Sequence, residues 1–347
     1  MISIGGSAGA VEALQYLVAG LPADLDAAVL VTVHITATAR SALPQILTRA
    51  GPLPATHARN GASIAPGSIL VAPPDRHLLL HEGRVRLSAG PKVNRHRPSV
   101  DVMLASAARW AGPDLISVVL SGALDDGAVG AALTARAGGR VMVQRDARFP
   151  GMPAAAQAAV PAATAIPLAE LAPALCAAIR PRPAAATRPG AGPEGVSMSM
   201  ADSDDPLFLS ADESRLTRLV CPDCSGSLAQ VDLPAISYYR CHVGHQWSPQ
   251  HLAAAQAETV EAKLWTAVAA LEEQAAFLRH LAGGRHPATA GEATEHREAA
   301  DRAAELARLI TGQLDYTPSP APEDHNQPGA TAPAAIHLQG DPSKPGP

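Results

Sequence analysis

The chain has 347 residues, of which 47% are apolar, 3% aromatic and 17% charged, and its formal net charge is −5. The apolar share excludes a wholly disordered protein, and the mild negative charge gives no support for a nucleic-acid partner. No apolar run reaches the ~20 residues of a membrane-spanning helix, and no basic segment precedes a long apolar one, so we expect a cytoplasmic protein without membrane insertion.

Residues 1–180 alternate short β-branched runs with helical patterns. The runs predict strands at residues 1–4, 28–35, 68–72, 115–120 and 140–144. Helices are predicted at 10–19, 99–111 and 128–137, and a hairpin at 77–88. Continuous apolar strands that alternate with helices indicate a doubly wound, mostly parallel, Rossmann-like α/β sheet, which we assign to a first domain at 1–180.

The rest of the chain divides into four segments. We predict a Pro/Ala/Gly-rich linker at 181–215, a Cys/His module at 216–249, a helical region at 250–314 and a disordered tail at 315–347. We expect the first helix of the helical region to form a hairpin with the weaker helical pattern at 289–314 or to self-associate. The reason is a coiled-coil seam with alternating steps of four and three at Leu264, Val268, Leu271, Ala275 and Leu278.

The first predicted strand runs directly into Gly5-Gly6-Ser7-Ala8-Gly9 and then into a helix. This is the G-x-S-x-G spacing of a nucleophile elbow, in which the helix N-terminus favours a developing oxyanion. Two other readings fit the pentapeptide: a phosphate-binding glycine turn, and a serine that only caps the helix. The turn lacks both G-x-G-x-x-G and a Walker lysine, which argues against a nucleotide site.

Two further polar residues follow apolar strands of the same predicted sheet. His34 ends one strand, and Asp126 lies in the turn after another. Because parallel strands present their C-terminal ends at one edge, we expect His34 to serve as the base for Ser7 and Asp126 to hold the histidine. A structural histidine and a pair of helix-capping acids are the alternatives, and we assign the neighbouring Asp125 to capping.

Several segments of residues 1–180 resemble the chemotaxis protein-glutamate methylesterases, the CheB family. The string from Asn94 to Asp101, Asn-Arg-His-Arg-Pro-Ser-Val-Asp, is the longest and most specific of them. The other matching segments are Gly5-Gly6-Ser7-Ala8-Gly9 with Val11-Glu12-Ala13-Leu14, Val33-His34, Leu120-Ser121-Gly122 with Asp126-Gly127, and Gly151-Met152-Pro153.

The resemblance implies a serine hydrolase with Ser7 as nucleophile, His34 as base and Asp126 as orienting acid. It implies that the substrate is a glutamate methyl ester on a methylated chemoreceptor, with glutamine deamidation as a second activity and no cofactor for catalysis. The candidates for substrate or oxyanion contacts are Ala8, Ala123, Arg95, Arg97 and Met152.

The chain departs from the family pattern in three places. Ala10 stands where a glycine is common, and Ala123-Leu124 replaces the Met-Gly that usually precedes the aspartate. The receiver domain that precedes many members is absent from the sequence, so we expect control by a partner or by the C-terminal half. The alternative functions are a serine esterase on another methylated protein and a degenerate, non-catalytic signalling scaffold, with the C-terminal helices as the surface for a signalling partner.

The Cys/His module contains Cys221-Pro-Asp-Cys224 and, after sixteen intervening residues, Cys241-His242-Val243-Gly244-His245. A single C-x-x-C also fits a redox pair, but two close pairs within about thirty residues are typical of a tetrahedral zinc site. We therefore predict a zinc-ribbon-like module with a structural zinc ion on Cys221, Cys224, Cys241 and His245. His242 is the alternative fourth ligand, although its position next to Cys241 would strain the turn.

Overall fold

The computed structural model describes residues 1–38, 41–179, 214–283 and 289–316. It divides into two compact units, Met1–Lys263 and Leu264–Pro347. Apart from two residues each, the predicted linker at 181–215 and the predicted tail at 315–347 lie outside the described residues. No helix in the described part of the chain is long and apolar enough to cross a membrane.

The first unit is built on a seven-stranded sheet in which every pairing is parallel. The prediction of a parallel α/β sheet is thus confirmed. The sequence patterns had indicated five of its strands and missed the two edge strands of three residues each. In spatial order the strands are β3 (Ala55–His57), β4 (Ile69–Val71), β2 (Val29–Val33), β1 (Ile2–Gly6), β7 (Ile116–Val119), β8 (Arg140–Gln144) and β9 (Thr164–Ile166).

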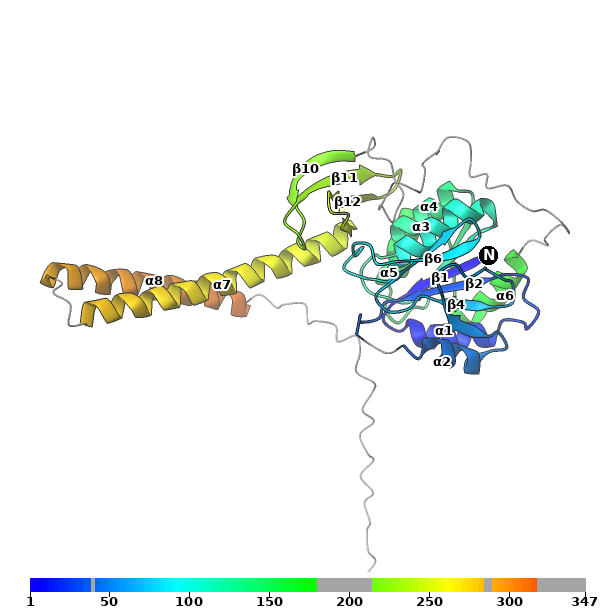
Figure 1. The fold of residues 1–347 in the computed structure, drawn as a ribbon, viewed down its shortest axis with the longest axis horizontal. Coiled ribbons are helices and arrows are strands. Elements are labelled where there is room, and N and C mark those ends of the chain that lie inside the picture. Colours follow the sequence, from blue (N-terminus) through cyan, green and yellow to red (C-terminus); the bar gives the residue numbers. More distant parts are fainter. Residues whose placement is uncertain (39–40, 180–213, 284–288, 317–347) are drawn as a thin grey trace, which may run out of the picture. The chain divides into compact units, whose positions relative to one another are not determined.

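Helices cover both faces of this sheet (Figure 1). The central strands are buried along their whole length, which explains why they read as continuous apolar runs. One face carries α1 (Ala10–Ala19), α2 (Leu43–Ala50) and α6 (Leu168–Ala178), and the other carries α3 (Val100–Ala111), α4 (Ala128–Arg136) and α5 (Gly151–Ala159). A short 3-10 turn, Gly112–Asp114, follows α3.

A hairpin of β5 (His77–His81) and β6 (Arg84–Ser88) follows β4, as the sequence predicts. Its two central residues, Glu82 and Gly83, both have positive φ, 48° and 75°. This is the backbone that a two-residue hairpin turn requires, because it matches the right-handed twist of the paired strands.

A second, antiparallel sheet forms the Cys/His module. It packs against the first domain through an apolar cluster in which Val231 and Tyr238 meet Val102 and Val129. A separate buried cluster joins two of the cysteines to Trp247 and to the start of α7. The strands are β10 (Ser214–Val220), β11 (Ser227–Asp232), β12 (Ser237–Cys241) and β13 (Gln246–Trp247).

Two long helices, α7 (Pro249–Gly283) and α8 (Ala290–Tyr316), lie in the predicted helical region. In the second unit a small buried cluster joins Ala275 of α7 to Ala300 and Ala303 of α8. Ala275 is one of the predicted seam residues, and Leu271 and Leu278 pack against the same cluster. The cluster is built almost wholly from alanine, so it buries little area for each residue.

Candidate active site

The predicted nucleophile, Ser7, lies in the turn between β1 and α1. Its backbone N–H donates to the carbonyl of Ser121 at 2.9 Å, which ties this turn to the turn after β7. Gly9 caps α1 with φ +73°, a conformation that favours glycine. A Cβ atom on Gly122 would lie 3.1 Å from the Cβ of Ser7 and 2.1 Å from the sulfur of Met152, so only glycine allows the two turns to pack this closely.

The structure brings His34 and Asp126 to the same edge of the sheet as Ser7. His34 follows β2, and its Nδ1 atom lies 3.1 Å from the Oγ atom of Ser7. Its Nε2 atom lies 2.7 Å from Oδ2 of Asp126. An ionised carboxylate only accepts hydrogen bonds, so Nε2 carries the proton and Nδ1 is free to accept the proton of the serine hydroxyl.

Asp126 is completely buried and sits at the N-terminus of α3. The backbone N–H groups of Val100 and Asp101 donate to its carboxylate at 2.7 Å and 3.2 Å. Ser99 Oγ donates at 2.9 Å, and Asn94 Nδ2 at 3.1 Å. The carboxylate therefore receives four hydrogen bonds besides that of His34, and the free N–H groups at a helix N-terminus favour its negative charge.

Two of the buried aspartates of this region, Asp126 and Asp101, have pKa values displaced in opposite directions. Burial alone would raise the pKa of Asp126, but the hydrogen bond and the charge of His34 hold it well below its usual value. Burial, followed by the negative charge of Asp126, raises the pKa of Asp101 well above its usual value. Asp126 is thus the member of the pair that stays ionised beside the histidine.

Several residues that surround His34 and Asp126 were not predicted from the sequence. Asn94 and Ser99 were quoted only as part of a similar string, yet both are buried and both donate to Asp126. His96 stacks on the ring of His34 with 3.5 Å between ring centroids and 8° between planes. The signal that could have found them is the high density of polar residues at 94–99, a stretch that the fold largely buries.

The oxyanion candidates lie in the two turns that meet at Ser7. In the described part of the chain, neither the N–H of Ala8 nor that of Ala123 donates a hydrogen bond to the protein. Leu124, which stands where the family has glycine, adopts φ +58°. The turn therefore keeps a left-handed residue at this position, at a cost of about 1 kcal/mol for a non-glycine side chain.

The remaining substrate candidates are engaged in contacts within the protein. Arg97 donates to Asp75 at 2.7 Å and to the carbonyl oxygens of Ala89 and Gly90. Met152 is completely buried, and its N–H donates to the carbonyl of Gly122 at 2.8 Å. These contacts give both residues a role in holding their loops.

Arg95 has the most accessible side chain of these candidates, with 38% exposed. It pairs with Glu258 of α7, and its guanidinium lies 5.8 Å from the ring centroid of Trp247. Arg95 thus faces the start of α7 and the Cys/His module as well as solvent.

The assignment of Asp125 to helix capping is wrong. The N-cap of α4 is Gly127, and the N–H groups of Gly127 and Gly130 at the start of this helix donate to Oδ1 of Asp101, not to Asp125. The Asp125 carboxylate is buried and instead accepts hydrogen bonds from Ser248 Oγ and from His251 Nδ1, the latter at 2.6 Å. Both partners lie more than a hundred residues away in the chain, so a local reading of the turn had no means to find them.

His77 is a second buried histidine close to Asp126. Its Nε2 atom donates to the carbonyl of Pro91 at 3.0 Å, and its Nδ1 atom accepts from the N–H of Ser99 at 3.3 Å. Burial lowers the pKa of His77 to about 4. His77 is therefore neutral at pH 7 and positions Ser99, one of the donors to Asp126.

This depressed pKa predicts acid sensitivity of the fold. Between pH 6.5 and about 4 the unfolded chain binds a proton at His77 that the folded chain does not, so this group should lower the free energy of unfolding by about 3 kcal/mol as the pH falls through that range. Asp101, whose raised pKa lets the folded chain keep a proton that the unfolded chain releases, acts in the opposite direction, so only the difference between wild type and a His77 variant isolates this contribution. Denaturant unfolding of wild type and His77→Gln at several pH values tests this, and parallel pH curves would contradict it.

The predicted metal ligands converge in the Cys/His module. Cys221, Cys224, Cys241 and His245 each offer one ligand atom, and these atoms all lie within 4.8 Å of one another. Cys224 and Cys241 are 3.6 Å apart at sulfur, and His245 Nδ1 lies 3.6 Å and 3.8 Å from the sulfurs of Cys241 and Cys221. Tetrahedral zinc separates such ligand atoms by about 3.6–3.8 Å, so this donor set fits the ion.

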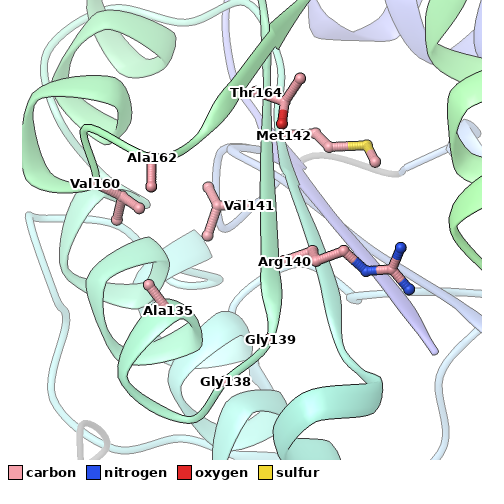
Figure 2. Close-up of a pocket in the computed structure, with 9 residues that line it drawn as sticks. All are labelled: Ala135, Gly138, Gly139, Arg140, Val141, Met142, Val160, Ala162 and Thr164. Atoms are coloured by element: carbon pink, nitrogen blue, oxygen red, sulfur yellow. The ribbon is translucent and has the colours of Figure 1, made fainter.

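A cavity of about 270 Å³ lies at the opposite end of the sheet, where β8 begins (Figure 2). Val141, Val160 and Ala162 line it, whereas the side chains of Arg140 and Met142 point to the other side of the strand. Thr164 and Arg140 are the polar residues of its lining, and Ser7 lies beyond the other end of the parallel strands. This cavity is therefore separate from the serine turn.

Comparison with known proteins agrees with this geometry. The chain is 38% identical over 179 residues to protein-glutamate methylesterase/protein-glutamine glutaminase 4 of Anaeromyxobacter dehalogenans, covering 50% of each chain. It is 36% identical over 151 residues to a protein of the same description from Yersinia pestis, covering 42% of this chain and 43% of the relative. The chain thus spans about half the length of the curated relatives it matches.

A solved structure and a family model match the same region. The crystal structure of the Thermotoga maritima CheB methylesterase catalytic domain matches with a TM-score of 0.50 and 27% identity, covering 51% of this chain and 97% of that one. Residues 2–175 match the family model described as CheB methylesterase. With a parallel α/β sheet that carries Ser7, His34 and Asp126 at one edge, and with this match over half its length, the chain belongs to the CheB methylesterase family.

Proposed function

We propose that this chain is a protein-glutamate methylesterase that hydrolyses glutamate methyl esters on methylated chemoreceptors and also deamidates glutamines. The observation that carries the proposal is the continuous hydrogen-bonded series from Ser7 Oγ through His34 to the buried Asp126. Membership in the family supplies the substrate class, and the relatives' names supply the second activity.

The reaction follows from the direction of these hydrogen bonds. Ser7 Oγ attacks the ester carbonyl while His34 Nδ1 takes the hydroxyl proton, and Asp126 stabilises the imidazolium that forms. His34 then returns the proton to the leaving methoxide, and methanol departs. Water, deprotonated by the same nitrogen, hydrolyses the acyl-enzyme and releases glutamate and free Ser7. With glutamine as substrate, ammonia leaves in place of methanol.

The negative oxygen of each tetrahedral intermediate needs donors in place before the reaction begins. We assign this role to the N–H groups of Ala8 and Ala123, which the protein leaves unbonded in the described part of the chain. The partial positive charge at the N-terminus of α1 adds to them. Arg95 is the group that we expect to contact the receptor.

Methanol release from a methylated chemoreceptor by the full chain tests this function. Release by the wild type, and its loss in the Ser7 variant described in the Discussion, is the expected result. Release from another methylated protein but from no receptor would replace the proposed substrate by that of a more general serine esterase. A folded chain that releases methanol from neither would favour the non-catalytic scaffold.

We further propose that the Cys/His module is a zinc ribbon that binds one structural zinc ion. Four protein ligands leave no coordination position open for water, so the ion supplies stability and takes no part in ester chemistry. Cysteines that are not paired in disulfides persist in a reducing compartment, which is why we place the protein in the cytoplasm. A signalling partner on a hairpin of α7 and α8 stays a prediction.

Metal analysis tests the zinc ligands. Purified wild-type chain should carry about one zinc ion, and Cys224→Ser and His245→Ala should lose most of it, because each removes one of four bonds to the ion. His242→Ala, a substitution of an exposed histidine outside the ligand set, is the matched control and should keep the metal. Full zinc content in the Cys224 variant would place the site elsewhere.

A further inference from the structure

The Cys/His module touches the loop that holds the catalytic acid. We call residues 92–99 the Asn94 loop. The N–H of Asn94 donates to the carbonyl of Gln246 at 2.8 Å, and the N–H of Ser248 donates to Oδ1 of Asn94 at 2.7 Å. The carbonyl of Lys92 accepts from the N–H of Gln246 at 3.4 Å. The loop therefore pairs with the last strand of the module.

These contacts decide which way the Asn94 amide points. Its oxygen is occupied by Ser248, so its nitrogen faces the two buried carboxylates and donates to Asp126 and Asp101, each at 3.1 Å. The side chain is only 1% exposed, so bulk solvent does not compete for these bonds. If Ser248 moved away, Oδ1 of Asn94 would be a buried acceptor without a donor. No hydrogen bond to Oδ1 would then fix the orientation of the Asn94 amide.

A second set of contacts reaches the residue next to Asp126. Asp125 accepts from Ser248 Oγ and from His251 Nδ1, and all three side chains are nearly inaccessible to solvent. His251 also lies edge-on to His96, with 5.7 Å between ring centroids, and His96 stacks on His34. The first turn of α7 thus contacts Asp125, the neighbour of Asp126. It also reaches His34 indirectly, through the ring of His96.

The module is anchored firmly enough to impose this geometry. Val231 and Tyr238 are 0% and 1% exposed and pack with Val102 and Val129 of the helices α3 and α4. Burial of apolar side chains from water stabilises such a contact. The α3 helix is the one whose N-terminus binds Asp126, so the module holds the acid site from two sides.

The module's own shape depends on the four metal-ligating side chains. Cys221 and Cys241 share a buried cluster with Trp247, the residue directly before Ser248. Metal binding in small Cys/His modules is coupled to their folding. Loss of the ion would therefore release the strand Gln246–Trp247 and, with it, the donor to Asn94.

We propose that zinc binding to the Cys/His module controls the catalytic centre, with Ser248 and His251 as positioning residues for Asn94 and Asp125. The ion never meets the substrate. It keeps the module in the shape that orients Asp126 and His34, so the zinc-loaded chain has a more reactive Ser7 than the zinc-free chain. The inference rests on the proposed serine chemistry and goes beyond it by making a metal site its regulator.

The test uses the full chain and measures the rate at which a fluorophosphonate labels Ser7, alongside methanol release. Such a probe requires the activated serine but no receptor. We expect zinc removal by a chelator, and separately His251→Ala, to slow labelling and to lower kcat by about 10- to 100-fold with little change in KM, since small misplacements of catalytic groups have effects of this size. Addition of zinc to the chelated protein should restore its labelling rate and its kcat.

Two companion variants separate positioning from general damage. His251→Asn keeps a donor close to the place of Nδ1 and should recover most of the rate, whereas His242→Ala should match the wild type. His251→Ala should keep its zinc and its circular dichroism, while the low-field proton resonance of the His34–Asp126 hydrogen bond broadens or shifts.

Wild-type labelling rates in both the zinc-free chain and His251→Ala, with residues 1–179 still folded, would overturn the inference. If the wild type is labelled at Ser7 but releases no methanol from receptors, the proposed substrate fails while the labelling ratios still decide the zinc control. A wild type that is not labelled at all would overturn both the proposed serine chemistry and its control by zinc.

Discussion

Replacement of Ser7 by alanine is expected to lower the rate of methyl ester hydrolysis by about 10⁴- to 10⁶-fold, the range found when the nucleophile of a serine triad is removed. His34 and Asp126 would remain in place, but no oxygen would stand 3.1 Å from Nδ1 to attack the carbonyl. The free energy of unfolding should change by no more than about 0.5 kcal/mol, because the hydroxyl contributes little to packing.

The measurement is methanol release at saturating receptor, together with denaturant unfolding of the same preparation. Ser68→Ala is the matched control, since Ser68 is similarly half-buried but precedes β4 at the opposite edge of the sheet. Near wild-type turnover in folded Ser7→Ala would exclude Ser7 as the nucleophile, and an equal loss in the control would point to a contaminating or unstable preparation.

Replacement of Asp126 by asparagine should lower kcat by about 10⁴-fold, the loss that follows when the histidine of a triad is held in the wrong tautomer. The introduced amide would keep its oxygen for Ser99 and Asp101, which both donate to Oδ1 in the wild type, and this turns its nitrogen toward His34. Nε2 of His34 would then accept a hydrogen bond from this amide instead of donating one to a carboxylate. Nδ1 would carry the hydrogen and lose its ability to take the proton of Ser7.

Single-turnover kinetics with wild type, Asp126→Asn and Asp24→Asn test this argument, because Asp24 is exposed and outside the site. The tautomer itself can be read from the ¹⁵N chemical shifts of His34. The shift typical of a protonated nitrogen should belong to Nε2 in the wild type and to Nδ1 in the Asp126 variant. Turnover within tenfold of wild type in the Asp126 variant would mean that another group orients the base.

Local sequence patterns placed the regular elements well where burial is complete. The strand β8 and the helix α1 were predicted with the bounds that the structure shows, Arg140–Gln144 and Ala10–Ala19. The edge strands β3 and β9 escaped because three residues are too few to show a period, and because half of their positions face solvent. Their strand character comes from pairing with β4 and β8, which is a tertiary property.

The candidate site also has features that follow from local sequence and features that depend on tertiary contacts. Ser7, His34 and Asp126 were predictable because each follows the C-terminal end of a strand, and parallel strands bring those ends to one edge. The turn that holds Asp125 was read as a cap because its partners, Ser248 and His251, are not local. No spacing rule connects residues that a linker separates in the chain.

The sequence by itself predicted the parallel sheet, the three residues that meet at one edge of it and the four side chains of the Cys/His cluster, since each depends on burial patterns or spacings within one segment. Only the tertiary structure decided that Asn94 and α3 hold Asp126, that His96 stacks on His34, and that the Cys/His module packs against this site. The physical reason is range: hydrophobic periodicity and turn chemistry act over a few residues. The orientation of a buried amide or carboxylate is set by whichever donors the folded chain brings to it.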